Sequence, residues 1–261
     1  MTSERKTKQF LLTPAAGKSI IAQSLLFVPA IMDALQNRTV VIIAGTTNGY
    51  VAEEILNKID QNTEFSKKRF FRGITLPPEH ATIDTGRIAD ESLFPGDVVI
   101  VKGKWEKGKT IFDVVDNLKE GDIIIKGANA VNLDTMQAAI YIGHPKAGTI
   151  GAAMQAVIGR RVELYLPVGL EKRISGDINR IAQKLNSPNA HGPRYYPVYG
   201  NVITEIEALK IMTGVEAELV ASGGVGGAEG SCWLAVTGTG EQMNKAEKII
   251  RSVQEEPPFK L

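Results

Sequence analysis

A lysine and an asparagine follow directly after an apolar run in the middle of the chain, where they could contact a ligand. The run Gly121-Asp-Ile-Ile-Ile-Lys126 predicts a buried strand, and the turn Gly127-Ala-Asn129 follows it. Ligands of α/β sheets collect at the carboxyl ends of parallel strands. Side-chain amides there can bind hydroxyl or carbonyl groups, and a lysine can bind an anion. The alternative is that Asn129 and Asn132 only shape the turn through local hydrogen bonds. The candidate ligand-binding residues of this turn are Lys126, Gly127, Ala128 and Asn129.

A second candidate site lies at the turn after an earlier apolar run. Thr39-Val-Val-Ile-Ile-Ala44 predicts a strand and Tyr50 to Ile59 predicts a helix, with a short glycine-bounded turn between them. Free backbone N–H groups and the positive end of the helix dipole favour an anion there, commonly a phosphate group. The alternative is an ordinary helix cap. The candidate ligand-binding residues of this turn are Gly45, Thr46, Thr47, Asn48 and Gly49.

A third glycine-bounded loop, Gly143 to Gly151, leads into a helix that we predict from Thr149 to Ile158. His144 could move a proton near neutral pH and Lys146 could hold a phosphate or a carboxylate, so these two are the candidate catalytic residues. Gly148 and Thr149 are further candidates for ligand binding. The alternative is that a lone histidine before a proline is simply exposed.

Strand-like and helix-like stretches alternate along most of the chain, which predicts an α/β fold with a mostly parallel sheet and helices on both faces. We expect a three-layer αβα, Rossmann-like domain over residues 1–190. The pattern of residues 195–257, which follow a polar linker at 187–192, predicts a small α+β, ferredoxin-like lid or dimerisation module. Residues 60–95 predict an irregular insert with a short strand near 81–83.

The remaining elements follow from the same hydrophobic patterns. In the first domain we expect a helix from Pro14 to about Leu35, bent at Pro29, strands at 97–102, 138–142 and 161–166, and a helix at 110–118. In the second we expect an extended segment at 195–202, a helix at 204–212, strands at 215–221 and 232–237, and a helix at 241–253.

Composition excludes several classes of function. Lys and Arg number 30 against 29 Asp and Glu, so a net charge of +1 gives no general attraction to nucleic acid. A single cysteine, Cys232, excludes an internal disulfide and a Cys-rich zinc site, and we expect it to be a packed strand residue. The three histidines are scattered, so we predict no metal and no cofactor.

The apolar stretch from Ser19 to Met32 is shorter than the roughly 20 residues of a membrane helix, so we predict no membrane association and a cytoplasmic protein.

Together the three loops resemble those of the superfamily of ribose-5-phosphate isomerase, glucosamine-6-phosphate deaminase and the CoA transferases, over roughly Thr39 to Lys172. Residues 39–49 resemble that family's first strand and its Gly-Thr-Gly-Ser-Thr phosphate turn. Residues 122–132 resemble its Asp-Gly-Ala-Asp-Glu turn. Residues 146–152 resemble either its Lys-Gly-Gly-Gly-Gly-Ala loop or the Asn-Lys-x-Gly-Thr segment of methylthioribose-1-phosphate isomerases. The resemblance implies a sugar-phosphate-isomerase-like domain and a homo-oligomer.

The sequence departs from this family where the family's chemistry takes place. Lys126, Asn129 and Ala130 stand where those isomerases place two aspartates and a glutamate. Neither an amide nor an alanine can carry a proton between carbons at neutral pH. We therefore predict a divergent member that binds a small phosphorylated or anionic metabolite without catalysis. The alternative is an isomerase or transferase of non-standard mechanism, in which Lys146, with His144 or Lys126, replaces the lost carboxylates. A nicotinamide-dependent enzyme is disfavoured because no glycine fingerprint follows the first strand.

Overall fold

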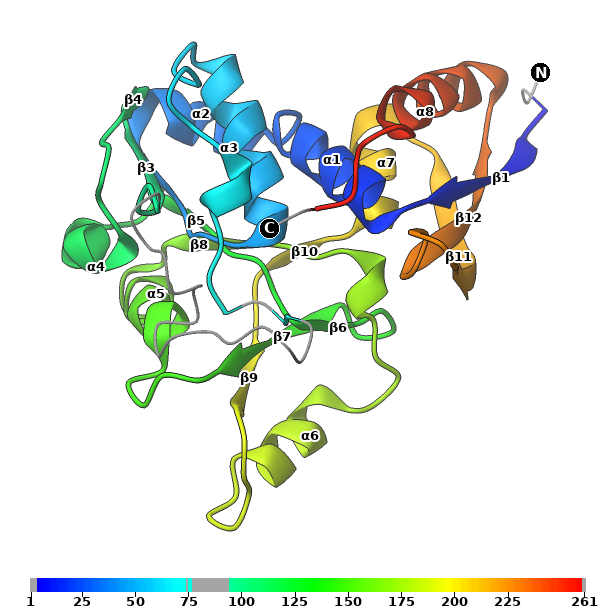
Figure 1. Ribbon diagram of the computed structural model, residues 1–261. Coiled ribbons are helices and arrows are strands. Elements are labelled where there is room, and N and C mark those ends of the chain that lie inside the picture. The colour runs from blue at the N-terminus through cyan, green and yellow to red at the C-terminus, as the bar shows by residue number, and fades with distance from the viewer. Residues whose placement is uncertain (1–3, 74, 77–93, 260–261) are drawn as a thin grey trace.

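A six-stranded sheet forms the centre of the molecule in the computed structural model, which describes residues 4–73, 75–76 and 94–259 (Figure 1). The strand order is β10-β8-β5-β2-β3-β4. The bounds of these strands in chain order are β2 Thr39–Ile42, β3 Val98–Val101, β4 Lys104–Trp105, β5 Ile123–Ile125, β8 Glu163–Pro167 and β10 Asn201–Ile203. Strands β2, β5, β8 and β10 are parallel to their neighbours in this set. The prediction of an α/β fold with a mostly parallel sheet is therefore confirmed.

Strand β3 runs antiparallel to β2, and β4 runs antiparallel to β3. The run 97–102 was predicted as a strand, and β3 confirms this. The hydrophobic pattern of the run does not, however, predict whether the strand is parallel or antiparallel to its neighbours. A strand buried on both faces is apolar throughout whether its neighbour is parallel or antiparallel, because both faces are covered in either case.

Alternate residues of the central strands pack into two separate cores. In β2, Val40 and Ile42 belong to one core, while Val41 and the following Ile43 belong to the other. This division follows from the two-residue period of a strand, which points successive side chains to opposite faces. Both faces of the sheet are consequently covered, which explains why the strands read as continuous apolar runs.

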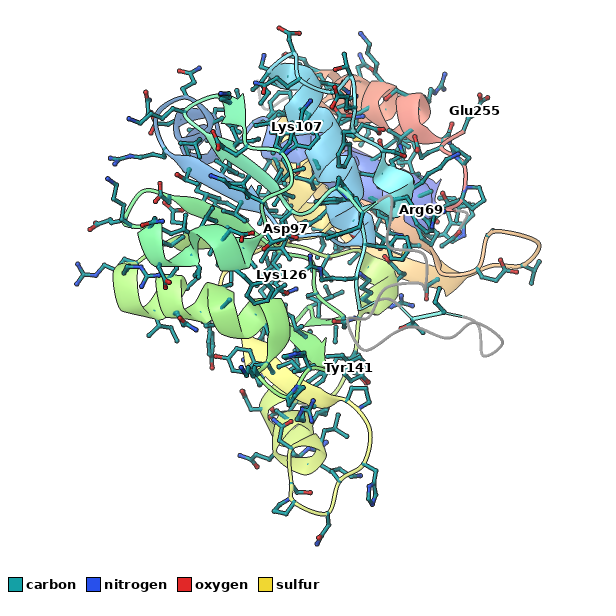
Figure 2. The ribbon with its side chains drawn as sticks, turned by 60° about the vertical axis from the view of Figure 1, so that its left-hand side comes forward. Arg69, Asp97, Lys107, Lys126, Tyr141 and Glu255 are labelled. Carbon is teal, nitrogen blue, oxygen red and sulfur yellow. The ribbon has the colours of Figure 1, made fainter. Side chains whose placement is uncertain are left out.

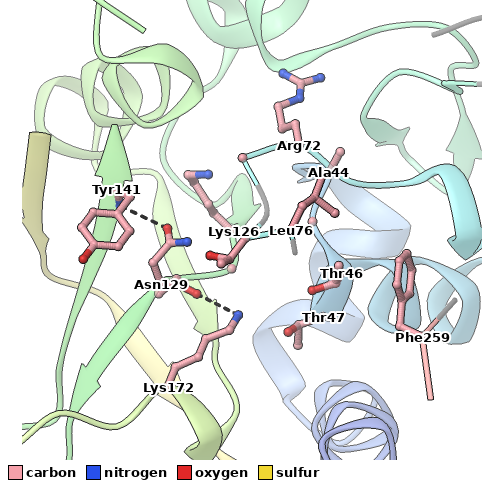
Figure 3. Close-up of a pocket in the computed structure, with 15 residues that line it drawn as sticks. Ala44, Thr46, Thr47, Arg72, Leu76, Lys126, Asn129, Tyr141, Lys172 and Phe259 are labelled. Carbon is pink, nitrogen blue, oxygen red and sulfur yellow. Dashed lines mark hydrogen bonds between the residues drawn. The ribbon is translucent and has the colours of Figure 1, made fainter. Parts of the chain in front are cut away.

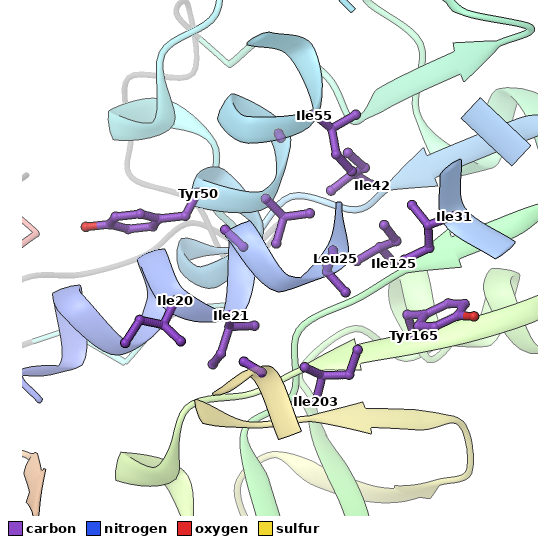
Figure 4. Packing of buried hydrophobic residues seen from close by; sticks show 14 of the residues in the cluster. Ile20, Ile21, Leu25, Ile31, Ile42, Tyr50, Ile55, Ile125, Tyr165 and Ile203 are labelled. Carbon is purple, nitrogen blue, oxygen red and sulfur yellow. The ribbon is translucent and has the colours of Figure 1, made fainter. Parts of the chain in front are cut away.

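Helices α1 (Pro14–Leu25), α2 (Pro29–Asn37) and α3 (Thr46–Lys58) cover one face, and α4 (Ile111–Val114) and α5 (Gly148–Arg160) lie on the other (Figure 1). Figure 4 shows the first core, where Leu25 and Ile21 of α1 meet side chains from the sheet. Fully burying a side chain of this size contributes about 1.5–3 kcal/mol. The helices thus hold the sheet rigidly, and with it the turns at the ends of its strands.

The predicted helix from Pro14 to Leu35 is two helices, bent by 66° at the break. Thr13 caps α1 by accepting a hydrogen bond from the Ala16 N–H, and Pro29 begins α2. Val28 is extended, as expected for a residue before proline, so the bend that we predicted at Pro29 is a complete interruption. Within the described parts of the chain no single helix is long and apolar enough to cross a membrane, although α1 and α2 together pass that test as a bent pair.

Helix α3 begins at Thr46, four residues before the Tyr50 that we predicted as its start. The segment predicted as a loop is therefore the first turn of the helix. Gly49 lies inside α3, where a Cβ atom would come within 3.0 Å of Lys67 Cβ. The glycine that suggested a loop is thus explained by the close approach of the segment before Phe70.

A second, antiparallel sheet has the order β1-β12-β11, with β1 Lys6–Leu12, β11 Glu216–Gly223 and β12 Ser231–Gly238. Helices α7 (Glu205–Thr213) and α8 (Gly240–Val253) accompany it. The strands and helices predicted after residue 203 are confirmed to within about two residues, and Cys232 is a buried residue of β12, as predicted. The N-terminal strand β1 was not predicted, because its polar residues give no clear alternation.

The third sheet has the order β6-β7-β9, with β6 Ala130–Asn132, β7 Gln137–Ile142 and β9 Arg194–Val198, and α6 (Ile178–Leu185) packs on it. The extended segment predicted at 195–202 is therefore divided between two sheets, because β9 pairs with β7 and β10 pairs with β8. The division into domains at 1–190 and 195–257 stays a prediction. The short strand predicted near 81–83 lies outside the described residues.

Two further elements differ in their bounds from the prediction. The helix expected at 110–118 is the single turn α4 followed by a 3-10 turn at Val115–Asn117, since Thr110 and Asp113 form a capping box that fixes only its start. Strand β8 begins two residues later than expected because Arg161 adopts a left-handed conformation at the end of α5.

Candidate ligand-binding site

A cavity of about 690 Å³ opens at the carboxyl ends of β2 and β5. The turns after these two strands form opposite walls: Figure 3 shows Lys126, Asn129 and Lys172 on one side, facing Thr46 and Thr47 on the other. The other described residues that line it are Ala44, Gly45, Arg72, Gly73, Thr75, Leu76, Gly127, Ala128, Tyr141 and Phe259. The parallel pairing of β2 and β5 is what brings the two turns together.

The turn after β2 presents the amino end of α3 to this cavity. Gly45 is the residue before the helix, and no side chain in the described parts of the chain accepts a hydrogen bond from the first N–H groups of α3. Thr46 and Thr47 line the cavity, and the buried Thr47 hydroxyl has no hydrogen-bond partner among the described residues. Unpaired N–H groups at a helix amino terminus attract an anion, because the helix dipole adds to their partial positive charge.

Asn48 has a structural position and does not line the cavity. Its side-chain amide donates hydrogen bonds to the Ile43 carbonyl at 2.7 Å and to the Ile125 carbonyl at 3.0 Å. These bonds join the ends of β2 and β5 directly beneath the cavity. Gly49, one residue later, is also buried in α3 and away from it.

The turn after β5 supplies the facing wall. Asn129 lines the cavity, and its side-chain oxygen accepts a hydrogen bond from the Tyr141 N–H at 3.1 Å, which fixes the amide between β5 and β7. Asn132 does not line the cavity: its side-chain oxygen accepts hydrogen bonds from the N–H groups of Asp134 and Thr135 at 3.0 Å. The turn-shaping alternative therefore holds for Asn132, whereas Asn129 remains available to a ligand.

Lys126 is the most unusual group in the cavity, because its side chain is only 9% exposed and no hydrogen bond or ion pair holds its ammonium group among the described residues. Burial lowers its pKa to about 8, with the nearby charge of Asp97 opposing this shift and the smaller effects of the Arg72 and Lys172 charges adding to it. Lys126 and Asp97 lie close together inside the molecule (Figure 2).

Asp97 is committed to holding the backbone in place. Its carboxylate accepts hydrogen bonds from the Ala44 N–H at 2.9 Å and the Ile111 N–H at 2.8 Å, and it lies 3.4 Å from the Arg72 guanidinium. The carboxylate therefore anchors the end of β2 and positions Arg72 at the rim of the cavity. It does not itself line the cavity.

Lys172 is the second lysine of the cavity. It ends a 3-10 turn, Leu170–Lys172, that follows β8, and its ammonium group donates a hydrogen bond to the Ala128 carbonyl at 2.9 Å. Burial lowers its pKa, while Glu171 has the opposite effect. No carboxylate lines the cavity in the part of the chain that the structure describes, so its charged lining is Lys126, Lys172 and Arg72.

The third predicted loop is not brought to this cavity. His144 and Lys146 are exposed in the turn before α5, where the His144 Nδ1 accepts a hydrogen bond from the Lys146 N–H at 3.2 Å. Gly148 and Thr149 form the start of α5 and also lie outside the cavity lining. Roles for these four residues stay predictions.

Several lining residues were missed by the sequence analysis. Arg72 falls in a segment without regular structure, Tyr141 is an outward residue of β7, and Phe259 lies close to the carboxyl end of the chain. Phe259 packs on Phe71 with 5.8 Å between ring centroids, which brings the end of the chain to the cavity. Of the lining residues that were not named as candidates, only Lys172 had a local sequence signal for a site, because it follows the end of a predicted parallel strand.

No known protein-family model matches this chain, and no curated protein matches it. Among the described residues no group of three or more His, Cys, Asp and Glu side chains could hold a metal ion. The cavity and the charges that line it are therefore the features that point to a function.

Proposed function

We propose that this protein binds a small phosphorylated or otherwise anionic metabolite in the cavity between the β2 and β5 turns. One observation carries the proposal. Two buried or partly buried lysines and the amino end of α3 line one cavity, and among the described residues no side chain caps that helix end and no carboxylate enters the cavity. An anion there would gain charge-assisted hydrogen bonds and would offset the mutual repulsion of the cations.

The proposal includes binding without turnover. The cavity wall has no described carboxylate that could carry a proton between the carbons of a sugar, which is the chemistry of carboxylate-dependent isomerases. The alternative, an isomerase or transferase of non-standard mechanism, is favoured by one observation, the lowered pKa of the Lys126 amine. Recovery of a bound sugar phosphate unchanged after long incubation would support binding, and its conversion would support the alternative.

The wider assignments remain part of the same proposal. Helices on both faces of a mostly parallel sheet support a three-layer, Rossmann-like domain, and β1, β11 and β12 with α7 and α8 support a ferredoxin-like unit. The two facing turns support a divergent relative of the sugar-phosphate isomerase superfamily. A homo-oligomer, a cytoplasmic location and the absence of nucleic-acid and membrane partners are proposed on the sequence alone.

Thermal unfolding with inorganic phosphate tests the anion site. At constant ionic strength, phosphate should raise the Tm of the wild-type protein, and a concentration of 100 times Kd stabilises by about 2.7 kcal/mol. The substitution Lys126→Met should remove most of this increase, because it deletes a charge inside the cavity. Lys146→Met is the matched control, since it deletes a lysine that was also predicted from sequence but lies outside the cavity.

The two substitutions distinguish the two predicted locations. Loss of the phosphate effect in Lys146→Met together with its retention in Lys126→Met would place the anion at the start of α5 and refute the proposed site. A wild-type Tm that phosphate leaves unchanged would refute the anion site altogether.

A further inference from the structure

We propose that the Lys126 amine condenses reversibly with the aldehyde or ketone carbonyl of an anionic ligand, so that the cavity selects carbonyl-bearing anions and holds them as an imine. This inference rests on the proposed function and adds to it the chemical class of the ligand. The Lys126 amine lies in a cavity whose opposite wall, at the amino end of α3, can bind the anionic group of such a ligand.

The position of Lys126 meets the geometric requirement. It is the residue directly after β5, and its backbone N–H donates to the Tyr165 carbonyl at 2.9 Å, so the base of the side chain is fixed to the sheet. The side chain reaches the cavity while being nine-tenths buried. The amino end of α3, with Thr46 and Thr47, lies across the cavity (Figure 3). A ligand with an anionic group against α3 can therefore present its other end to Lys126.

The surroundings also keep part of the amine neutral, which nucleophilic attack requires. Because burial and the neighbouring Arg72 and Lys172 charges lower the pKa of Lys126 to about 8, roughly one tenth of the amine is neutral at pH 7. No described hydrogen bond engages its nitrogen. Neighbouring cations and a desolvated pocket are the two ways by which proteins activate a lysine for imine formation.

Lys172 is the obvious rival within the same cavity, and its contacts argue against it. Its ammonium group donates to the Ala128 carbonyl, and attack on a carbonyl would break that bond. The charges of Glu171 and Glu205 also favour its protonated form. Among the described residues, Lys126 has only Asp97 as an opposing charge, and that carboxylate is occupied by two backbone N–H groups and Arg72.

The chemistry balances without any further reagent. The neutral Lys126 Nζ attacks the carbonyl carbon, a C–N bond forms as the C=O π bond breaks and its electron pair moves to the oxygen, and a proton from the nitrogen moves to that oxygen to give a carbinolamine. Loss of one water molecule then gives the imine, whose protonated form the Asp97 charge stabilises. Hydrolysis reverses both steps, so the ligand is recovered unchanged and no oxidant or reductant is needed.

Reductive trapping with pyridoxal 5′-phosphate tests this step, because that probe carries both an aldehyde and a phosphate group. The full chain is incubated with the probe, reduced with sodium borohydride and digested, and the labelled lysines are identified by mass spectrometry. We expect Lys126 to be labelled at least tenfold faster than any other lysine, and excess inorganic phosphate to slow this labelling. The variant Lys126→Arg should lose the fast phase, while Lys184→Arg, a matched change at an exposed lysine outside the cavity, should retain it.

The outcomes separate the imine from the anion site. If phosphate raises the Tm of the wild-type protein but the probe labels only exposed lysines, the imine is refuted and the proposed function stands. If Lys126 is labelled quickly but phosphate neither protects it nor raises the Tm, the anion site is refuted. Fast labelling that persists in Lys126→Arg and disappears in Lys172→Arg would assign the chemistry to Lys172 and overturn the inference.

Discussion

Replacing Lys126 by methionine should make the protein without ligand more stable at neutral pH. Burial, with the charges of Arg72 and Lys172, lowers the pKa of Lys126 from 10.5 to about 8. At about 1.4 kcal/mol per pKa unit, this difference corresponds to roughly 3 kcal/mol that folding loses when the amine is charged. Methionine has a similar length and carries no charge, so Lys126→Met should gain up to that amount at pH 7.

The pH dependence has a definite sign. Below about pH 8 the amine is protonated in both the folded and the unfolded chain, and the full cost is present. Between about pH 8 and 10.5 the unfolded chain holds the proton more tightly, so the stability of the wild-type protein rises with pH. The advantage of the variant should therefore shrink across this window and be nearly gone at its upper end.

Urea unfolding followed by tryptophan fluorescence measures this difference, because Trp105 is buried in the folded protein. The free energies of unfolding of the wild type and the variant are compared at pH 7, 9 and 10, with Lys184→Met, a change at an exposed lysine, as the control for loss of charge. A variant that is less stable than the wild type by the same amount at every pH would show that the buried amine is well solvated or paired, and would refute the reasoning.

Three further predictions concern other parts of the fold. Burial, followed by the Glu171 charge, raises the pKa of Glu205 to about 8, so the Tm of the wild-type protein should fall as the pH rises toward 8. The substitution Glu205→Gln should make this fall smaller. Plots of Tm against pH that run parallel for the two proteins would contradict the prediction. Burial raises the pKa of Cys232 to about 11, so a disulfide reagent at pH 8 should modify it only after denaturant is added, and rapid reaction of the native protein would count against this. Thr239→Ala removes the capping box of α8 and should cost about 1 kcal/mol in urea unfolding, whereas the exposed Thr7→Ala should cost less.

Much of the fold followed from the sequence because buried strands and capped helices leave local patterns. Thr13-Pro14 predicted the start of α1, and the apolar run at 121–126 predicted β5. Strand direction left no such pattern, since β3 is as apolar as its parallel neighbours. Strand β1 is held by its pairing with β12, a partner more than 200 residues away, and no local pattern reports such a contact.

Some residues of the candidate site could likewise be predicted from the sequence, and others could not. Gly45, Thr46 and Thr47 could be predicted, as could the turn after β5, because position after a parallel strand determines where a residue lies. Arg72 and Phe259 could not, since their segments have no periodicity and are brought to the cavity only by tertiary packing. His144 and Lys146 illustrate the converse: a glycine-bounded loop before a helix predicts a site, but the exposed α5 turn lies away from the cavity.

The charge of Lys126 gives the two proposals opposite dependences on pH. A simple anion binds best when the amine is protonated, so its affinity should weaken as pH rises past about 8. A carbonyl anion needs the neutral amine for attack, so condensation should become faster over the same range. Both trends come from one nitrogen that is buried, unpaired among the described residues and flanked by cations. A cavity lining without a described carboxylate is therefore compatible with chemistry at this site, provided that the chemistry proceeds through an amine.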